Sequence, residues 1–223
     1  MKEVVLDTET TGLSVKDGHR IVEIGCIELE NLIPNSNKFH CYLNPERKVS
    51  EKALEVHGYT DQFLADKRKF IDIAEEFLLF IKDKRLIIHN AEFDISHLNN
   101  ELKIVGKEKI EIKNVIDTLD IARDKFPGSQ ISLDALCKRY RIDNSKREKH
   151  TALVDCELLT KVYINLIDQK EPSLNFISGN EDNKDIKFKG TTNYSKKIIK
   201  PSNKEATLHK QFLKNFLKKN YFS

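Results

Sequence analysis

Short apolar runs that end at polar residues dominate the start of the chain. Residues 3 to 7, Glu-Val-Val-Leu-Asp, contain a short apolar run that stops at Asp7, and the polar, turn-rich residues 8 to 12 follow. Residues 20 to 30 alternate between apolar and polar types, and residues 38 to 43 form a second β-like run. The pattern predicts a meander of three strands, the first of which carries Asp7 at its end.

The spacing of apolar residues then becomes helical. Ser50 is a cap-like residue before a short helical segment that reaches His57, and the apolar positions from 73 to 81 recur at helical spacing. Residues 85 to 89 read as a strand, 91 to 105 as a helix and 114 to 117 as another strand. This alternation predicts an α/β domain with polar residues at its strand ends.

Two further helices complete the predicted domain. Ser132 and Thr151 are suited to be N-caps of helices that run to about residue 140 and about residue 167. The second helix has an apolar side made of Leu153, Leu158, Val162 and Leu166. We therefore expect a folded domain over residues 1–168.

The composition changes after this domain. Residues 169–203 are rich in Asn, Lys, Ser and Gly and show little apolar periodicity, which is typical of a flexible linker. Residues 204–223 predict an amphipathic helix, whose lysines lie away from an apolar side made of Leu208, Phe212, Leu213, Phe216 and Leu217.

Charge divides the chain in the same way. The net charge is +3, but residues 180 to 223 hold eleven Lys against four acids, or +7, which leaves −4 for the first 179 residues. A mildly acidic domain binds nucleic acid only with the help of cations or a partner protein. The four cysteines are scattered without a metal-binding or redox spacing, and no run is apolar enough to span a membrane. We expect a cytoplasmic protein with reduced cysteines.

Four acids stand where side chains at the ends of elements would be exposed: Asp7 and Glu9 in DTE, Asp94 in HNAEFD, and Asp155 in HTALVD. In an extended segment the first and third side chains point the same way, so Asp7 and Glu9 can address one site. Hard divalent cations prefer oxygen ligands, and two such ions can hold both reacting oxygens of a phosphodiester displacement. The four acids therefore predict a metal site.

His150 precedes Asp155 by five positions, on the loop just before the last predicted helix of the domain. A neutral imidazole, with an ordinary pKa of about 6.5, can accept a proton from a water molecule at cellular pH. Taken singly, each signal is common, because helical acids usually face solvent and loop histidines often only cap or decorate a surface. The order and separations of the four acids and His150 along the chain, taken together, indicate a catalytic site.

The three segments resemble the three motifs of the DEDDh family of 3′→5′ exonucleases: residues 7–9, residues 90–94, and His150 to Asp155. The resemblance covers about residues 2 to 168 and is densest from Leu133 onward, where it is similar to the proofreading epsilon subunits of bacterial DNA polymerase III. It implies a ribonuclease H-like exonuclease fold, with a mixed central sheet flanked by helices and a flexible C-terminal tail.

The resemblance also implies roles for single residues. Two Mg²⁺ or Mn²⁺ ions would be bound by Asp7, Glu9, Asp155 and Asp94, the last partly through water, and His150 would be the general base. The terminal nucleotide would contact Asp7, Glu9 and Asp155 together with Thr8, Thr10, Leu13, His57 and Phe93. Within that set, Thr10 would lie near the 3′-hydroxyl and Leu13 between the last bases, while Glu23 would have a structural or supporting role. His57 and Phe93 are equally compatible with a histidine at a helix end and a core phenylalanine.

The implied partners are DNA 3′ ends, the polymerase catalytic subunit bound through the C-terminal tail, a small accessory subunit and the sliding clamp. Residues 171–176, Glu-Pro-Ser-Leu-Asn-Phe, loosely resemble a clamp-binding peptide, with Glu171 at the position usually taken by glutamine, and a plain linker remains the alternative. The terminal helix could also pack on its own domain, or contact DNA or an anionic membrane through its lysines.

The sequence thus predicts a proofreading 3′→5′ DNA exonuclease that removes mismatched 3′-terminal nucleotides as 5′-mononucleotides by two-metal-ion hydrolysis. Two alternatives stay open. One is a free-standing exonuclease of the same family that acts on RNA or oligonucleotide ends, because the catalytic set alone does not distinguish DNA from RNA. The other is a non-catalytic scaffold subunit of the polymerase.

Overall fold

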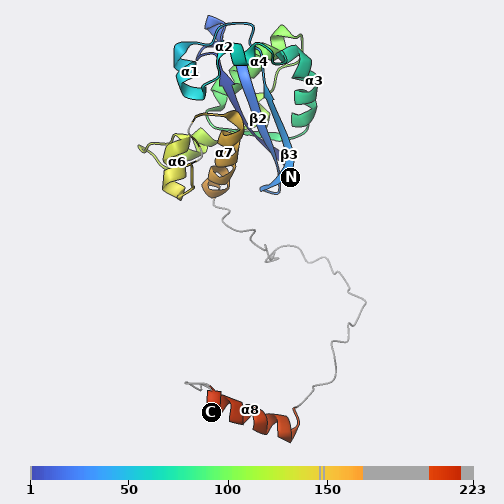
Figure 1. Cartoon of the computed structure of the whole chain (residues 1–223), viewed down its shortest axis with the longest axis vertical. Coiled ribbons are helices and arrows are strands. Elements are labelled where there is room, and N and C mark those ends of the chain that lie inside the picture. The colour runs from blue at the N-terminus through green and yellow to red at the C-terminus, as the bar shows by residue number, and fades with distance from the viewer. Residues whose placement is uncertain (1, 146, 148, 168–200, 217–223) are drawn as a thin grey trace, which may run out of the picture. The chain divides into compact units, whose positions relative to one another are not determined.

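A five-stranded mixed sheet forms the centre of the folded domain (Figure 1). Strands β1 (Lys2–Thr10), β2 (Ile21–Glu30) and β3 (Ile33–Tyr42) form the predicted antiparallel meander. Strands β4 (Arg85–Ile88) and β5 (Val115–Asp117) extend the sheet in parallel beside β1, which gives the order β3-β2-β1-β4-β5. Strand β1 therefore has a neighbour on both sides.

The computed structural model describes residues 2–145, 147, 149–167 and 201–216, which belong to two separate units of the chain. In the first unit, β3 begins at Ile33, five residues before the run that the sequence predicted. Asn31 and Leu32 adopt positive φ angles in the turn after β2, so Ile33 and Pro34 pair directly with Glu30 and Leu29. The early part of β3 is polar and partly exposed, and hydrophobic patterning therefore did not reveal it.

Helices cover both faces of the sheet. The predicted helices are α1 (Glu51–His57), α3 (Phe70–Ile81), α4 (Ala91–Ile104), α6 (Leu133–Tyr140) and α7 (Ala152–Leu166). The sequence did not predict α2 (Asp61–Leu64), α5 (Thr118–Lys125), or the 3-10 turns η1 (Val15–Asp17) and η2 (Ile112–Asn114). The Ser50 and Ser132 side chains accept the amides of Ala53 and Ala135, as N-caps do.

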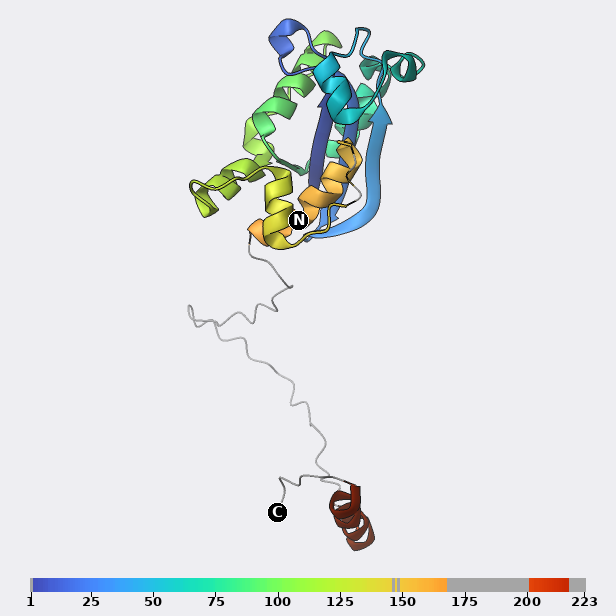
Figure 2. The same ribbon diagram turned by 60° about the vertical axis from the view of Figure 1, so that its left-hand side comes forward.

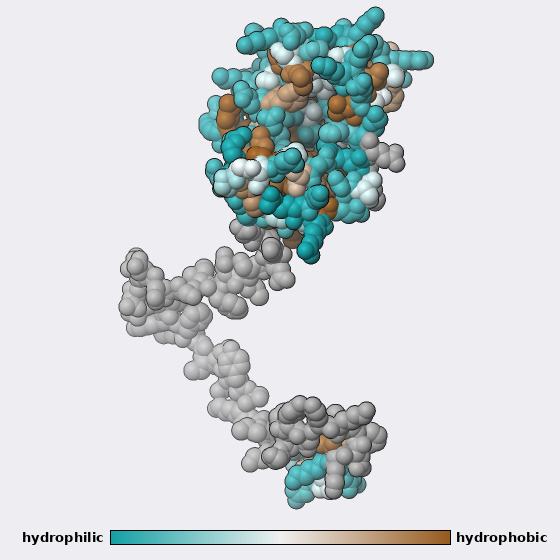
Figure 3. Space-filling view, turned by 90° about the vertical axis from the view of Figure 1, so that its left-hand side faces the viewer, coloured by the Kyte–Doolittle hydropathy of each residue, from teal (hydrophilic) through white to brown (hydrophobic). Residues whose placement is uncertain are grey.

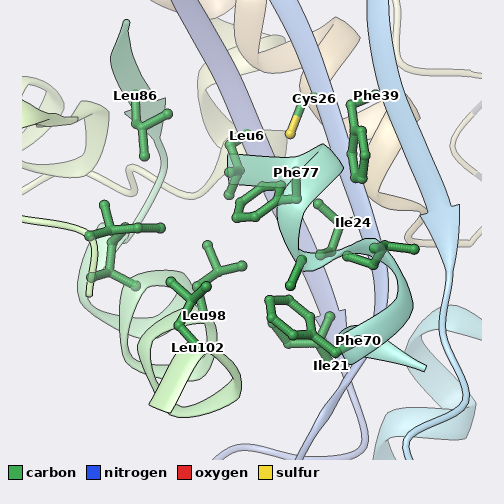
Figure 4. Packing of buried hydrophobic residues seen from close by; sticks show 14 of the residues in the cluster. Leu6, Ile21, Ile24, Cys26, Phe39, Phe70, Phe77, Leu86, Leu98 and Leu102 are labelled. Carbon is green, nitrogen blue, oxygen red and sulfur yellow. The ribbon is translucent and has the colours of Figure 1, made fainter. Parts of the chain in front are cut away.

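Alternate residues of β1 point into two apolar cores. Val4 and Leu6 pack with residues of α3 and α4 on one face, around Phe77 and Leu98 (Figure 4). Val5 packs on the other face with residues of α5, α6 and α7. All four cysteines are free and buried in these two cores, as expected. The mixed sheet with helices on both faces agrees with the predicted fold class.

Helix α7 lies close against β1 and β2, beside α6 (Figure 2). Gly25 of β2 allows this approach, because a Cβ at that position would lie 2.5 Å from the backbone carbon of Ala152. The Cys156 thiol, one residue beyond Asp155, also lies 3.2 Å from the Gly25 carbonyl oxygen, to which it donates a hydrogen bond. The first turn of α7 is thereby fixed next to the end of β1 that carries Asp7.

The second unit contributes one described helix, α8 (Asn203–Phe216). Ser202 and Glu205 form a reciprocal cap at its start, and the side chains of Leu208 and Phe212 are 56% and 54% exposed. The predicted linker and the last residues of the predicted terminal helix lie almost wholly outside the described residues, so the division at residues 168 and 203 stays a prediction.

The visible face of the folded domain is mostly hydrophilic, with separate hydrophobic patches (Figure 3). Among the described helices, none has the length and apolar composition required to cross a lipid bilayer.

Candidate active site

The four predicted acids come together at one edge of the sheet. Asp7 and Glu9 lie at the carboxyl end of β1, and Asp94 lies in the first turn of α4, directly after the parallel strand β4. Asp155 lies in the first turn of α7, which packs against β1. All four line one cavity of about 490 Å³, together with His150.

Local structure fixes the direction of these side chains. The pairing of β1 with β2 shifts by one residue between Glu9 and Thr10, and such a bulge re-aims the side chains beside it. Thr8 holds Asp94, because its amide and its hydroxyl donate to the same Asp94 oxygen at 3.0 and 2.7 Å. Thr8, predicted to contact substrate, is therefore buried and uses its hydroxyl to position a carboxylate.

Burial and nearby carboxylates raise the pKa of three of these acids, Asp7, Glu9 and Asp94. Burial, followed by the charges of Asp94, Glu9 and Asp155, raises the pKa of Asp7 well above its usual range. Burial, followed by the charges of Asp155, Glu23 and Asp94, raises the pKa of Glu9 to about 8. Burial also raises the pKa of Asp94 to about 7, although its hydrogen bonds from Thr8 oppose the shift. Such a cluster is stabilised by any positive charge placed among its carboxylates.

Among the described residues, Arg147 is the strong cationic partner of these acids. Its Nε and one terminal nitrogen donate to the two oxygens of Asp155 at 2.5 and 2.7 Å, and the Arg147 side chain is 7% exposed. A second contact joins the guanidinium to His150, whose Nδ1 lies 2.9 Å away. Burial and the charge of Arg147 lower the pKa of His150, so its imidazole is neutral at pH 7.

The donor set fits a divalent cation. One atom each of Glu9, His150 and Asp155 lie within 4.8 Å of one another, and Asp7 and Asp94 line the same cavity. Carboxylate oxygens are the ligands that Mg²⁺ and Mn²⁺ prefer, and a bound cation would oppose the rise in pKa that burial and neighbouring carboxylates cause at Glu9. The residues present can therefore hold such an ion.

A second cavity of about 420 Å³ adjoins the first and shares Glu9 and Phe93 with it. Thr10, Leu13 and His57, three of the residues predicted to contact the nucleotide, line this second cavity. Leu13 is 81% exposed, so its side chain can contact a ligand in this cavity. The Thr10 hydroxyl, by contrast, donates to the Gly12 carbonyl within the same loop.

His57 is buried at the end of α1, and internal contacts occupy both of its ring nitrogens. Nδ1 accepts the amide of Tyr59 at 3.0 Å, and Nε2 therefore carries the proton that is donated to the Thr10 carbonyl at 3.3 Å. Its ring also stacks on Tyr59. His57 thus lines the second cavity while holding the loop that contains Thr10.

Several residues that support the site had no predicted catalytic role. Glu23 is fully buried, and its carboxylate accepts the Tyr59 hydroxyl at 2.8 Å and the Ala152 amide at 2.9 Å while it also contacts His40. It therefore provides the cap of α7 that the Thr151 side chain does not. This matches the structural or supporting role expected for Glu23.

Arg147 and Gly25 were not predicted at all. Arg147 stands inside the densest part of the resemblance, yet arginine is common on surfaces and nothing in the spacing indicated a buried ion pair. Gly25 falls within an alternating strand, where a glycine can signal close approach of another backbone. That signal was present in the sequence and could have been used.

Comparison with known proteins places the chain in a family. Residues 4–163 match the family model described as exonuclease. The epsilon subunit of DNA polymerase III from Rickettsia felis is 44% identical over 224 residues, which cover 98% of each chain. The epsilon subunit from Haemophilus influenzae is 38% identical over 98% of this chain and 91% of the relative.

Solved structures agree on the fold. Exonuclease X in complex with 5′ overhanging duplex DNA has a TM-score of 0.58 at 25% identity, over 75% of this chain and 92% of that one. Exonuclease I has a TM-score of 0.66 at 16% identity, over 77% of this chain and 41% of the other. These likenesses confirm the ribonuclease H-like fold. The chain therefore belongs to the exonuclease family and, within it, to the group of the DNA polymerase III epsilon subunits.

Proposed function

We propose that this nuclease is a 3′→5′ DNA exonuclease that proofreads for a replicative polymerase. The observation that carries the proposal is the convergence of Asp7, Glu9, Asp94, Asp155 and His150 on one cavity. The adjoining cavity, lined by Leu13 and Phe93, offers apolar and aromatic surface on which an unpaired terminal base can stack. Its relatives' name, DNA polymerase III subunit epsilon, supports the same role.

The four acids would hold two divalent cations, Mg²⁺ or Mn²⁺. When bound, such ions neutralise the charge of a phosphodiester and make water a stronger nucleophile. The neutral imidazole of His150 would accept the proton of the attacking water. The Leu13 and Phe93 side chains would orient the terminal nucleotide, which would leave as a 5′-mononucleotide. Selectivity for mismatches would arise because a frayed 3′ end reaches the cavity at a lower unstacking cost.

The decisive assay is release of mononucleotides from a 3′-labelled primer, matched or mismatched, with Mg²⁺ or with EDTA. We expect faster release from the mismatched end, dependence on Mg²⁺, and no release by an Asp7→Ala variant. Glu92→Ala is the matched control, because Glu92 is an exposed acid in the first turn of α4, beside Asp94.

The assay separates this function from its rivals. Normal turnover by Asp7→Ala would overturn the proposed metal site. Release from RNA but not from DNA would indicate a free-standing ribonuclease, and no release with any metal would indicate a scaffold subunit.

The role of His150 has a test of its own. We expect His150→Ala to lower turnover far more than affinity for Mn²⁺, with the acidic limb of the wild-type pH profile lying below 6.5, because the pKa of His150 is lowered from that value. A large loss of Mn²⁺ affinity with little change in turnover per bound ion would instead make His150 a ligand.

The proposal includes partners. Helix α8, with Leu208 and Phe212 exposed, is a suitable segment for binding the polymerase catalytic subunit in an apolar groove. The suggested clamp-binding peptide at residues 171–176 lies outside the described residues. Contacts with the clamp and with a small accessory subunit stay predictions.

A further inference from the structure

Arg147 occupies the place where a cation is needed. Its guanidinium meets both oxygens of Asp155, and a second carboxylate, that of Asp134, lies 2.7 Å from the remaining terminal nitrogen. The Asp155 side chain is 5% exposed, so this is a buried, two-point ion pair of the kind that is costly to break without a replacement charge. A divalent cation at Asp155 is such a replacement.

The same guanidinium also determines which ring nitrogen of neutral His150 carries the proton. Arginine has only donors, so Nδ1 of the neutral imidazole must accept the hydrogen bond from Arg147 and the ring proton must reside on Nε2. With Nδ1 occupied and Nε2 protonated, neither nitrogen can accept a proton. His150 can act as a base only after Arg147 has left Nδ1.

We infer that Arg147 is a positioning residue that exchanges with the metal ion: it neutralises Asp155 and blocks His150 in the metal-free site, and metal binding displaces it from both. Asp134 lies in the first turn of α6 and its side chain is half exposed, so Arg147 keeps one carboxylate partner after the exchange. The inference rests on the metal site of the proposed function. It couples loading of the metal to release of the base, so that hydrolysis cannot begin in a partly assembled site.

The test is titration of the full-length, metal-stripped protein with Mn²⁺ alone. The electron paramagnetic resonance signal of free Mn²⁺ reports how much of the ion remains unbound. If Arg147 competes with the metal, Arg147→Met should bind Mn²⁺ about tenfold tighter than wild type or better, which corresponds to about 1.4 kcal/mol. Arg147→Lys keeps the charge without the two-point geometry, so its Mn²⁺ affinity should lie between those of wild type and Arg147→Met. Arg68→Met is the control, because Arg68 forms an exposed ion pair with Glu76 outside the cavity and its loss should leave affinity unchanged.

Equal or weaker Mn²⁺ binding by Arg147→Met would overturn the exchange, because it would mean that Arg147 assists the metal or is indifferent to it. Failure of wild-type protein to bind Mn²⁺ at all would instead overturn the proposed metal site. The two failures are therefore distinguishable.

A measurement on wild-type protein covers the case in which the variant does not fold. In nitrogen-15 NMR spectra recorded in EDTA, the Arg147 Nε proton should resonate downfield as a donor to carboxylate, and neutral His150 should be the Nε2–H tautomer. Added Mg²⁺ should remove the Arg147 signal from that position and change the Nδ1 shift of His150. Spectra of these two residues that do not respond to saturating Mg²⁺ would contradict the exchange.

Discussion

Glu9, Asp94 and Asp7 share a buried space, and each carboxyl group has a raised pKa in the folded chain. For Glu9 the pKa rises from 4.5 to about 8, so folding takes up a proton at any pH between these values. Stability without metal must therefore fall as pH rises toward 8, by up to about 1.4 kcal/mol per pH unit for each such group. This is the reverse of the usual behaviour of ion-paired acids.

We predict that the melting temperature in EDTA falls between pH 6.5 and 8. The window starts at 6.5 because the pKa values of five histidines are lowered from that value, so above it these histidines are largely neutral in both the folded and the unfolded chain: His19, His57, His89, His97 and His150. Glu9→Gln should flatten the slope, and saturating Mg²⁺ should do the same in wild type. Glu92→Gln, which changes an exposed acid, should leave the slope of melting temperature against pH unchanged. A melting temperature that rises with pH over this range would contradict the raised pKa values of the buried acids.

At this scale the sequence predicted the acids but not their partner. Carboxylates at strand ends follow from local patterning, and DTE, HNAEFD and HTALVD were sufficient to locate Asp7, Glu9, Asp94 and Asp155. The pairing of Arg147 with Asp155 depends on how residues 141–151 return to the start of α7, and no local spacing encodes that path. The internal use of both His57 nitrogens was hidden for the same reason.

Among the elements, α7 and β2 have the closest contact that matters for the site. Gly25 faces Asp7 across the strand pair, and its missing side chain lets the first turn of α7, with Asp155, rest on the sheet. A methyl group at 2.5 Å from helix backbone cannot be accommodated by side-chain rotation. The helix has to move, and Asp155 moves with it.

We predict that Gly25→Ala costs about 1–3 kcal/mol of stability, as overpacking does, and weakens Mn²⁺ binding in protein that remains folded. Cys26→Ala is the matched control: it lies next in β2 but points into the opposite core, so it should lower stability without weakening metal affinity. Calorimetry for stability and Mn²⁺ titration for affinity separate the two effects. Equal metal affinity in Gly25→Ala and wild type would show that α7 is not positioned by this contact.

The elements that the sequence did not reveal are short or polar. Helix α2 contains only four residues, and α5 starts from an Asp117 side chain that also accepts the amides of Asn90 and Ala91. Helices α1 and α6 are no longer than α5, but a serine cap before each marked its start. Serine caps and apolar faces therefore decided which elements could be predicted.

Over the whole molecule, charge is divided between an acidic folded domain and a basic tail. Residues 1 to 179 carry −4 and residues 180 to 223 carry +7, so the acidic part that holds the carboxylate cavity is joined to a segment of opposite charge. Helix α8 shows the apolar side chains of Leu208 and Phe212 to solvent. An exposed pair of this kind on a short helix is typical of a docking segment.

We predict that Leu208→Ser with Phe212→Ser in the full chain reduces binding to the polymerase catalytic subunit by tenfold or about that much, the loss typical of truncating two apolar anchors. Exonuclease turnover on a single-stranded primer should be unchanged, because the active site lies in the other unit. Lys210→Ser on the same helix is the control. Undiminished binding in a pull-down with the double variant would rule out α8 as the docking segment.

The central place of β1 has a consequence for how the protein would exchange its amide hydrogens with heavy water. Glu3, Val4 and Val5 of β1 pair with both β2 and β4, so the amides of this stretch should exchange only when the whole domain opens. Asp7 and Glu9 continue the same strand and pair with Gly25 and Glu23 of β2, while His150 belongs to a loop with a half-exposed ring. Deuterium uptake should therefore be slow in the strand that carries Asp7 and Glu9 and fast in the loop that carries His150.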